Sequence, residues 1–292
     1  MSRFSFSKDA TLRYCATRCR AVTAACLLAA LFVCQPLAAQ NSVGLKTPVR
    51  SPSASTGIIY AVMGDGELRW FRHAGRGDGS FSWEGPKKVG IGWGELTHVF
   101  SGGGGIVYGV QKNGDLMWYR HVGRQDGSFT WEGPKKVGTG WGNVTHVFSG
   151  GGGIIYAVME SGELRWFRHV GQEDGSFKWE GPKQVGTGWI VKDVFSGGGG
   201  IIYAVMDNGE LRWFRHVGRG DGSAVWEGPK PVGTGWFVKR AFSGGGGIIY
   251  AVMDNGELRW FHHVGRDDGS FRWEGPKQVG TGWVVEDIFS GE

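Results

Sequence analysis

Aspartate and tryptophan recur together along this chain at a spacing that could build a ligand site. A carboxylate in an Asp-Gly-Ser loop can accept hydrogen bonds from paired hydroxyl or amide groups. These loop residues are Asp78, Asp126, Asp174, Asp221 and Asp268. A tryptophan follows each loop: Trp83, Trp131, Trp179, Trp226 and Trp273. Another closes a Gly-x-Gly-Trp turn: Trp93, Trp141, Trp189, Trp236 and Trp283. An indole face suits the apolar side of a sugar ring, and its N–H is a donor.

Each of these residue types also has a purely structural interpretation, which the sequence leaves open. An Asp-Gly-Ser segment forms a turn in which the aspartate satisfies its own backbone. Tryptophan can instead pack between sheets, and this interpretation is favoured for a third set in the middle of an apolar strand. That set is Trp70, Trp118, Trp166, Trp213 and Trp260.

A histidine also recurs in every copy, and it predicts a structural or solvated role rather than a metal site. The five are His73, His121, His169, His216 and His263. No copy supplies a second histidine, cysteine or paired carboxylate at ligand spacing, so no metal or other cofactor is expected. No nucleophile, base and acid stand out from the repeated background either, so the sequence predicts a protein that is not an enzyme.

All of these residues belong to one repeat. An Ile-Ile/Val-Tyr anchor ends at Tyr60, Tyr108, Tyr156, Tyr203 and Tyr250, at spacings of 48, 48, 47 and 47 residues. Such a fixed period indicates a solenoid, a propeller or an array. The near-identity of the copies has two explanations, selection for equivalent sites or recent duplication.

Each copy predicts four short β-strands. In the last copy an apolar run, residues 248–253, precedes an Asp-Asn-Gly hairpin, and residues 258–264 form the next strand. Residues 271–279 contain Pro276, which confines that strand to an edge. Residues 284–289 form the fourth strand. We therefore predict an all-β, five-bladed β-propeller of ~47-residue, four-stranded blades, closed by the C-terminal strand pairing into the first blade.

The pattern Gly-x-x-Tyr-Ala-Val, a tryptophan after an Asp-containing loop, and Val-Gly-x-Gly-Trp, repeated five times, resembles the tachylectin family. The resemblance covers residues 57–292. It implies a lectin with up to five equivalent sites between blades for N-acetylated amino sugars such as N-acetylglucosamine and N-acetylgalactosamine. The aspartates and the two loop-associated tryptophan sets are the site residues that it suggests.

The first residues are typical of a targeting signal. Residues 1–39 carry five basic residues, an uncharged run and a small-residue end, which together predict a cleaved secretory signal peptide. An uncleaved membrane anchor is the alternative. Residues 40–56 are predicted to be a Ser/Pro-rich linker, and residues 57–292 the propeller. All four cysteines lie in the signal, so the mature chain has none, and a secreted or periplasmic location is expected.

Removing the signal leaves 27 basic against 26 acidic residues. This near-neutral charge gives no electrostatic reason to expect binding to nucleic acid. No further apolar run in the mature chain is long enough to span a membrane. We therefore expect a monomer whose partners are glycans. The alternatives are a propeller scaffold for protein–protein interaction without a sugar site and, less favoured, an enzyme or accessory domain acting on polysaccharide.

Overall fold

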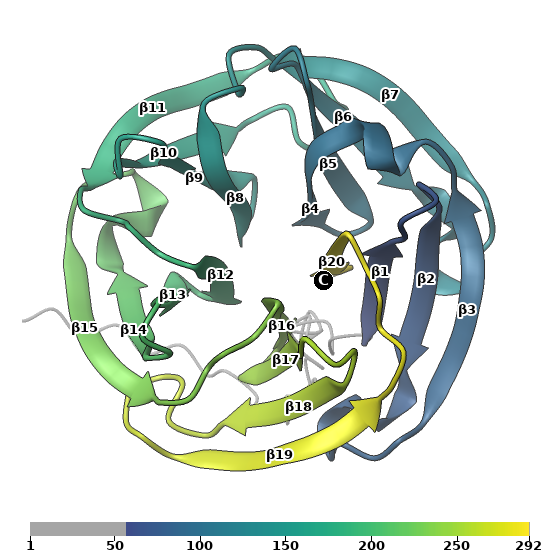
Figure 1. The fold of residues 1–292 in the computed structure, drawn as a ribbon. Helices are drawn as coiled ribbons and strands as arrows, with labels where there is room; N and C mark the ends of the chain where they lie inside the picture. The colour runs from purple at the N-terminus through teal and green to yellow at the C-terminus, as the bar shows by residue number, and fades with distance from the viewer. Residues whose placement is uncertain (1–56, 292) are drawn as a thin grey trace, which may run out of the picture. The chain divides into compact units, whose positions relative to one another are not determined.

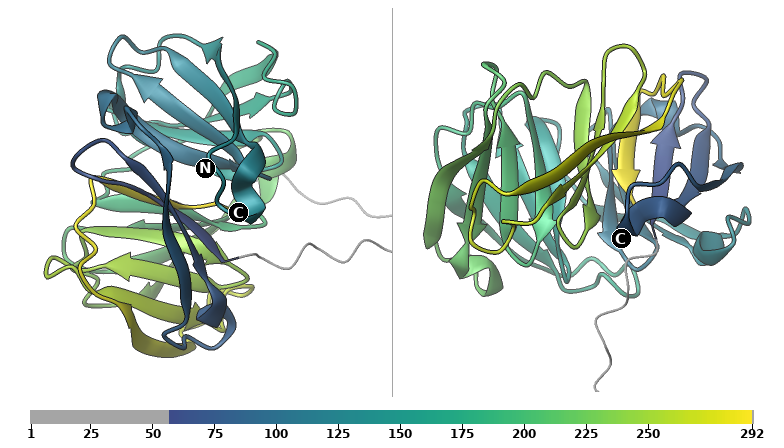
Figure 2. Two further views of the ribbon diagram at one scale, coloured as in Figure 1. Left: turned by 90° about the vertical axis from the view of Figure 1, so that its right-hand side faces the viewer. Right: turned by 90° about the horizontal axis from the view of Figure 1, so that it is seen from below.

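The computed structural model describes residues 57–291, and these form five four-stranded antiparallel sheets arranged in a ring (Figure 1). The predicted signal peptide and the whole of the predicted linker lie outside the described residues. The prediction of an all-β, five-bladed propeller is confirmed. Strand β20 pairs with β1, with Tyr60 opposite Phe289, so the last strand completes the first blade. Seen from the side, the outermost strand β19 runs obliquely across the ring (Figure 2).

The strands occupy equivalent positions in all five blades. From blade 1 to blade 5, the innermost strands are β20 (Asp287–Ser290), β4 (Leu96–Gly103), β8 (Val144–Gly151), β12 (Asp193–Gly198) and β16 (Arg240–Gly245). The second strands are β1 (Ile58–Val62), β5 (Ile106–Gln111), β9 (Ile154–Met159), β13 (Ile201–Val205) and β17 (Ile248–Val252). The third strands are β2 (Leu68–His73), β6 (Leu116–His121), β10 (Leu164–His169), β14 (Leu211–His216) and β18 (Leu258–His263).

The outermost strands are β3 (Trp83–Gly90), β7 (Trp131–Gly138), β11 (Trp179–Gly186), β15 (Trp226–Gly233) and β19 (Trp273–Gly280). Each contains a proline after a cis Gly–Pro bond, as in Gly275–Pro276, on the free edge that the sequence predicts. Short 3₁₀ turns complete the fold: η1 (Ala74–Gly77), η2 (Trp93–Glu95), η3 (Val122–Gln125) and η4 (Val217–Gly220).

The second strands are buried on both faces because each lies between two sheets. In β17 all five residues are buried, and Tyr250 and the neighbouring Trp260 have no exposed surface. The whole mid-strand tryptophan set is likewise fully buried, which confirms its interpretation as core. Glycine tracts turn the chain between the first and second strands, where Gly103, Gly104 and Gly105 all have positive φ. Non-glycine residues rarely adopt this conformation.

A phenylalanine from each innermost strand lines both of the cavities at the axis of the ring. These residues are Phe289, Phe100, Phe148, Phe195 and Phe242, each 5–7% exposed. They separate a cavity of about 120 Å³ at one end of the axis from one of about 360 Å³ at the other. The two axial cavities are therefore distinct from the spaces between blades.

Candidate functional site

An aromatic pocket opens between the first and second blades. Trp93, in the loop that joins β3 to β4, lies with its ring centroid 4.9 Å from that of Tyr119 in β6 and 5.3 Å from that of Trp131 in β7. The pocket has a volume of about 350 Å³, and Phe129 lines it as well. Its aromatic walls and open mouth suit the apolar face of a ring-shaped ligand.

The same aromatic triad recurs at every junction between blades. The tilted pairs Trp141–Phe167, Trp189–Phe214, Trp236–Phe261 and Trp283–Phe71 have ring centroids 4.6–4.8 Å apart. A tryptophan at the start of the outer strand completes each triad. Pockets of about 290 Å³ and 220 Å³ open at the junctions of blades 5 and 1 and of blades 4 and 5. The structure thus brings together the two loop-associated tryptophan sets that the sequence singles out.

The two tryptophans of a pocket use their indole N–H groups differently. Trp131 Nε1 donates to the carbonyl of Val89 in the preceding blade at 2.6 Å, and its four counterparts do the same. Trp93 Nε1 has no hydrogen-bond partner among the described residues and is not sealed from solvent. One tryptophan therefore anchors the blades, and the indole N–H of the other is not engaged by any described residue.

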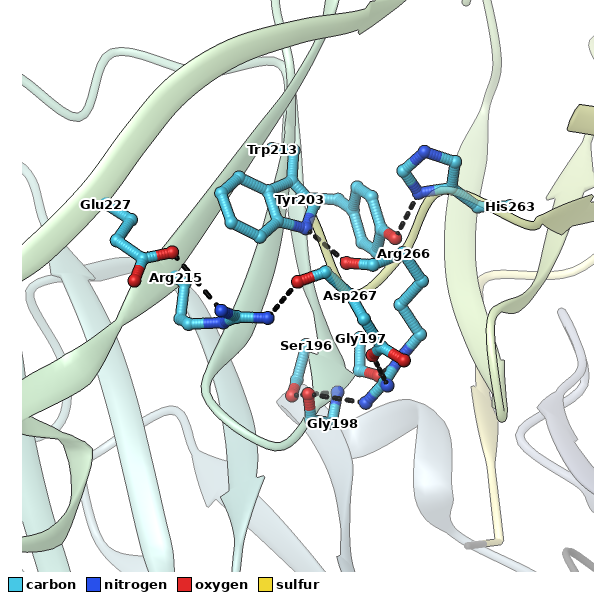
Figure 3. Close-up of polar contacts among 10 residues, drawn as sticks. All are labelled: Ser196, Gly197, Gly198, Tyr203, Trp213, Arg215, Glu227, His263, Arg266 and Asp267. Atoms are coloured by element: carbon cyan, nitrogen blue, oxygen red, sulfur yellow. Dashed lines mark hydrogen bonds and ion pairs between the residues drawn. The ribbon is translucent and has the colours of Figure 1, made fainter. Parts of the chain in front are cut away.

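Figure 3 shows the seam between blades 4 and 5, where further repeated contacts lie away from the pocket. Trp213 Nε1 donates to the carbonyl of Arg266 at 2.8 Å. The Arg266 guanidinium donates in turn to the carbonyls of Gly197 and Gly198, both at 2.9 Å. Arg215 bridges Glu227 and the carbonyl of Asp267. Apart from the Glu227 carboxylate, the acceptors are backbone carbonyls of the adjacent blade, so these contacts fix blade against blade.

The repeated histidines lie at these seams and are buried. His263 is 1% exposed, stacks on Trp273 at a centroid distance of 4.2 Å, and donates from Nε2 to the carbonyl of Ser270 at 2.9 Å. Its Nδ1 must then accept the Tyr203 hydroxyl. Burial lowers the pKa of the imidazole below its usual value and raises that of the phenol. The expected structural role of these histidines accords with this geometry.

The repeated aspartates lie apart from the aromatic pockets, in the loops that precede the outer strands. Asp126 Oδ1 accepts the backbone N–H of Ser128 at 2.9 Å, and Lys87 of the preceding blade donates to the Asp126 carbonyl. Gly127 carries the loop over the Trp70 indole, where a Cβ would come within 2.8 Å of the ring. The hydrogen bonds from Ser128 lower the pKa of the Asp126 carboxyl, and the other four aspartates are similarly shifted. The carboxylates thus form the backbone turn that the sequence offers as one interpretation.

A cluster that breaks the symmetry of the repeat surrounds the smaller axial cavity. One position of the innermost strands carries, from blade 1 to blade 5, Asp287, His98, His146, Asp193 and Arg240. Each side chain contacts the next blade: His98 Nε2 donates to the Thr145 carbonyl at 3.2 Å, and the Ala241 N–H donates to Asp193 Oδ2 at 2.7 Å. Burial raises the pKa of Asp193 to about 6. Sequence reasoning missed this cluster. The signal was visible, because the residue type at this position differs between copies of a repeat that is otherwise nearly constant.

Two further searches covered the described residues. No group of three or more His, Cys, Asp or Glu residues there is placed to hold a metal ion. Within the same residues, none of the helices has the length and apolar character required to cross a bilayer.

Comparison with known proteins places the chain in a family. No curated protein matches it. Among solved structures, a symmetrical protein from a study of its de novo evolutionary emergence is 22% identical, with a TM-score of 0.48, over 80% of this chain and 98% of that one. The SapL1 lectin, solved with alpha methyl fucoside, is 18% identical, with a TM-score of 0.35, over 68% of this chain and 65% of that one.

Yeast RCC1 (Prp20), solved with Kap60, is 13% identical, with a TM-score of 0.37, over 80% of this chain and 59% of that one. The Tachylectin family profile matches residues 61–288, which is most of the chain and includes part of every blade. Membership of this family supports the interpretation of the chain as a carbohydrate-binding propeller. The chain belongs to the tachylectin family.

Proposed function

We propose that this protein is a secreted, non-enzymatic lectin that binds glycans in the aromatic pockets between its blades. The observation that carries the proposal is the aromatic triad, Trp93, Tyr119 and Trp131 in this pocket, in which the Trp93 indole N–H has no partner among the described residues. The tilted aromatic walls cover one face of a pyranose, and the N–H orients a hydroxyl or acetamido oxygen. N-acetylglucosamine and N-acetylgalactosamine are the proposed ligands.

Five such sites on one ring would engage clustered glycans on a surface. Linking weak sites raises the apparent affinity by roughly 10²–10⁴ when the sites bind together. A monomer suffices for this, because the repeat itself supplies the valency. Secretion through the N-terminal segment would bring the ring to such surfaces.

Calorimetric titration with the two N-acetylated sugars tests the proposal. We expect weak binding with a stoichiometry near five per chain. Binding of intact N-acetylated glycans without their hydrolysis would support the non-enzymatic assignment. No heat at millimolar sugar, together with a blank glycan array, would refute the lectin assignment.

The aspartates remain predicted residues of the ligand site. One substitution distinguishes a role in ligand binding from a role in forming the backbone turn. Asp268→Asn keeps an oxygen that can accept the Ser270 N–H but removes the carboxylate. If the carboxylate accepts sugar donors, affinity falls at one of the five sites while the thermal midpoint is unchanged. Unaltered titration for the corresponding change in all five loops would restrict the aspartates to the turn.

A protein-binding scaffold is the second candidate, and one observation favours it. The loops after β11, β15 and β19 carry Ile190, Phe237 and Val284 with 76%, 57% and 73% of their surfaces exposed. The corresponding loops after β3 and β7 carry Gly94 and Gly142 instead. Exposed apolar side chains on adjacent blades are typical of interaction surfaces. A failed sugar titration would favour this function.

A further inference from the structure

The larger of the two axial cavities is built from equivalent residues of all five blades. It has a volume of about 360 Å³ and lies at the end of the ring where the innermost strands finish. Along each of these strands a phenylalanine is followed by a serine and then by a glycine tract, as in Phe195, Ser196 and residues 197–200. The phenylalanines close the inner end of the cavity, and the glycine tracts surround its mouth.

The serines add a ring of hydroxyl groups next to the phenylalanines. The Ser196 hydroxyl accepts the Gly198 N–H at 3.1 Å and donates to no described acceptor, so its proton is available to a ligand. Ser149 and Ser243 donate only over long distances, 3.4 and 3.5 Å, to backbone carbonyls. The full set that lines the cavity is Ser101, Ser149, Ser196, Ser243 and Ser290.

Four arginines bind the glycine tracts, one from each blade except the third, and each reaches the tract of the preceding blade. Arg219 donates from Nε and Nη2 to two carbonyls of its tract at 2.9 and 2.7 Å. Arg266 donates to two carbonyls of its own tract, both at 2.9 Å (Figure 3). These two arginines line the cavity itself. The other two are Arg76 and Arg124.

The glycines make room for these guanidinium groups. A Cβ at Gly199 would come within 3.3 Å of Arg266 Nη2, and one at Gly246 within 3.2 Å of Arg76 Nη2. Both distances are shorter than the optimal separation of nonbonded heavy atoms. The lack of side chains in the tracts therefore lets the charged groups lie against the backbone at the mouth of the cavity.

The positive charge at the mouth is only partly neutralised. A peptide carbonyl is a neutral acceptor, so a guanidinium that binds one keeps its charge. Arg266 is ion-paired with Asp267 at 2.5 Å, whereas Arg219 and Arg76 form no ion pair with any described carboxylate. Arg219 also retains Nη1 as a donor without a described partner. Charges of one sign around a cavity with apolar walls attract a ligand of the opposite charge.

We propose that the larger axial cavity binds a small organic anion, a carboxylate that carries an apolar ring or chain. The apolar part lies on the phenylalanines, and the carboxylate accepts hydrogen bonds from the serine hydroxyls and from the guanidinium groups of Arg219 and Arg266. The volume of the cavity lies within the range of small-molecule sites. This site is separate from the aromatic pockets between blades, and it does not depend on the proposed lectin function.

Titration of the full chain with benzoate tests the proposal. Benzyl alcohol, which lacks the charge, and acetate, which lacks the ring, are the control ligands. Calorimetry gives the affinities, and we expect benzoate to bind at least about tenfold more tightly than either control, because each control loses the charge-assisted hydrogen bonds or the buried ring.

The NMR signals of the indole N–H groups locate the ligand. Trp166 Nε1 donates to the Arg219 carbonyl at 3.0 Å, and Trp213 Nε1 donates to the Arg266 carbonyl at 2.8 Å. Benzoate should therefore shift the Trp166 and Trp213 signals and leave that of Trp93, in a pocket between blades, unchanged.

The repeat supplies a matched variant. In blade 3, Gln172 takes the position of the arginine and donates to the Gly102 carbonyl at 2.5 Å, so a glutamine holds a glycine tract without a charge. Arg219→Gln/Arg266→Gln should therefore fold, and it should bind benzoate at least about tenfold more weakly while its affinity for benzyl alcohol is unchanged. Gln172→Arg adds a fifth arginine and should strengthen benzoate binding.

Three results would overturn the proposal: equal affinities for benzoate and acetate, equal benzoate affinities for the wild type and the double variant, or benzoate shifts confined to the tryptophans of the pockets between blades. If the double variant does not fold, the three ligands and the location of the shifts on the wild type still decide. Sugar binding by the folded double variant should equal that of the wild type, so failure of the axial site and failure of the lectin function are distinguishable.

Discussion

The hydroxyl of Tyr203 donates to Nδ1 of His263 at 2.6 Å across the seam between blades 4 and 5 (Figure 3). Both residues are essentially unexposed. The same bond links Tyr60 to His121, Tyr108 to His169, Tyr156 to His216 and Tyr250 to His73. A ring of identical buried hydrogen bonds thus joins each blade to the next.

Removing one of these hydroxyls should destabilise the protein. Tyr203→Phe leaves His263 Nδ1 as a buried acceptor without a donor, which costs about 1–3 kcal/mol. At this chain length each kcal/mol lowers the thermal midpoint by about 2–4 °C. Tyr119→Phe is the matched control, because its hydroxyl has no partner among the described residues, and it should change stability by less than about 0.5 kcal/mol. Equal melting of the two variants would contradict a role for the seam bond.

The seam histidines should make stability depend on pH between about 7.5 and 5. Burial lowers the pKa of all five below the usual 6.5. The unfolded chain then binds more protons than the folded one as the pH falls below 6.5, so stability decreases. The full contribution is present above that pH and is lost as the pH falls through the folded pKa values. Urea unfolding at a series of pH values should show this decline, and a flat profile would contradict it.

Asp193 should change the stability of the fold with pH in the direction opposite to that of the seam histidines. Its pKa is raised to about 6, so the folded protein binds the proton more tightly than the unfolded chain, and protonation stabilises the fold. Asp193→Asn can still accept the Ala241 N–H but cannot titrate. Relative to the wild type, the variant should lose on the order of 1 kcal/mol between pH 7.5 and pH 5. Parallel pH profiles for the two proteins would contradict this assignment.

An exposed phenylalanine that lines a pocket should contribute to sugar binding with little effect on folding. Phe81 lines the pocket between blades 5 and 1 and is 66% exposed. Blade 4 carries Ala224 at the equivalent position. Phe81→Ala should weaken sugar binding at its pocket by roughly tenfold, and Ala224→Phe should strengthen binding at the pocket between blades 3 and 4. Calorimetry checks the affinities, and unchanged affinity in both variants would remove the phenylalanine from the site.

The pairing of β20 with β1, which closes the ring, should be required for the propeller to unfold as a single cooperative unit. A chain ending at Glu286 loses the strand that pairs with β1, so Ile59, Tyr60 and Ala61 expose an open sheet edge. We expect broad unfolding and association in size-exclusion chromatography. A monomer with an unchanged, sharp transition would show that the ring does not need this strand.

Much of the fold follows from the repeat alone. The period near 47 residues, the Asn-Gly hairpin before Glu257 and the edge position of Pro276 are local signals, and each matches the structure. Closure was predictable because the first copy lacks a preceding strand and the chain ends with one, Ile288-Phe289-Ser290. The hairpin and the edge proline depend on backbone chemistry within one copy, which neighbouring residues determine.

What each repeated side chain does was decided only by the tertiary structure, because its partners lie in adjacent blades. Sequence reasoning listed Trp83 and Trp93 among the candidate carbohydrate-binding residues, but it could not show that they line different pockets. Nor could it show that the first donates across a seam while the second has an indole N–H without a partner among the described residues. It could not show either that Gln111 and Tyr119, which take the places of a methionine and a phenylalanine in the other copies, line the same pocket, since they lie eight positions apart on different strands. The sequence by itself determined the repeat, its strands and its closure. The packing of five sheets around one axis decided which surfaces of that repeat are core and which are open to a ligand.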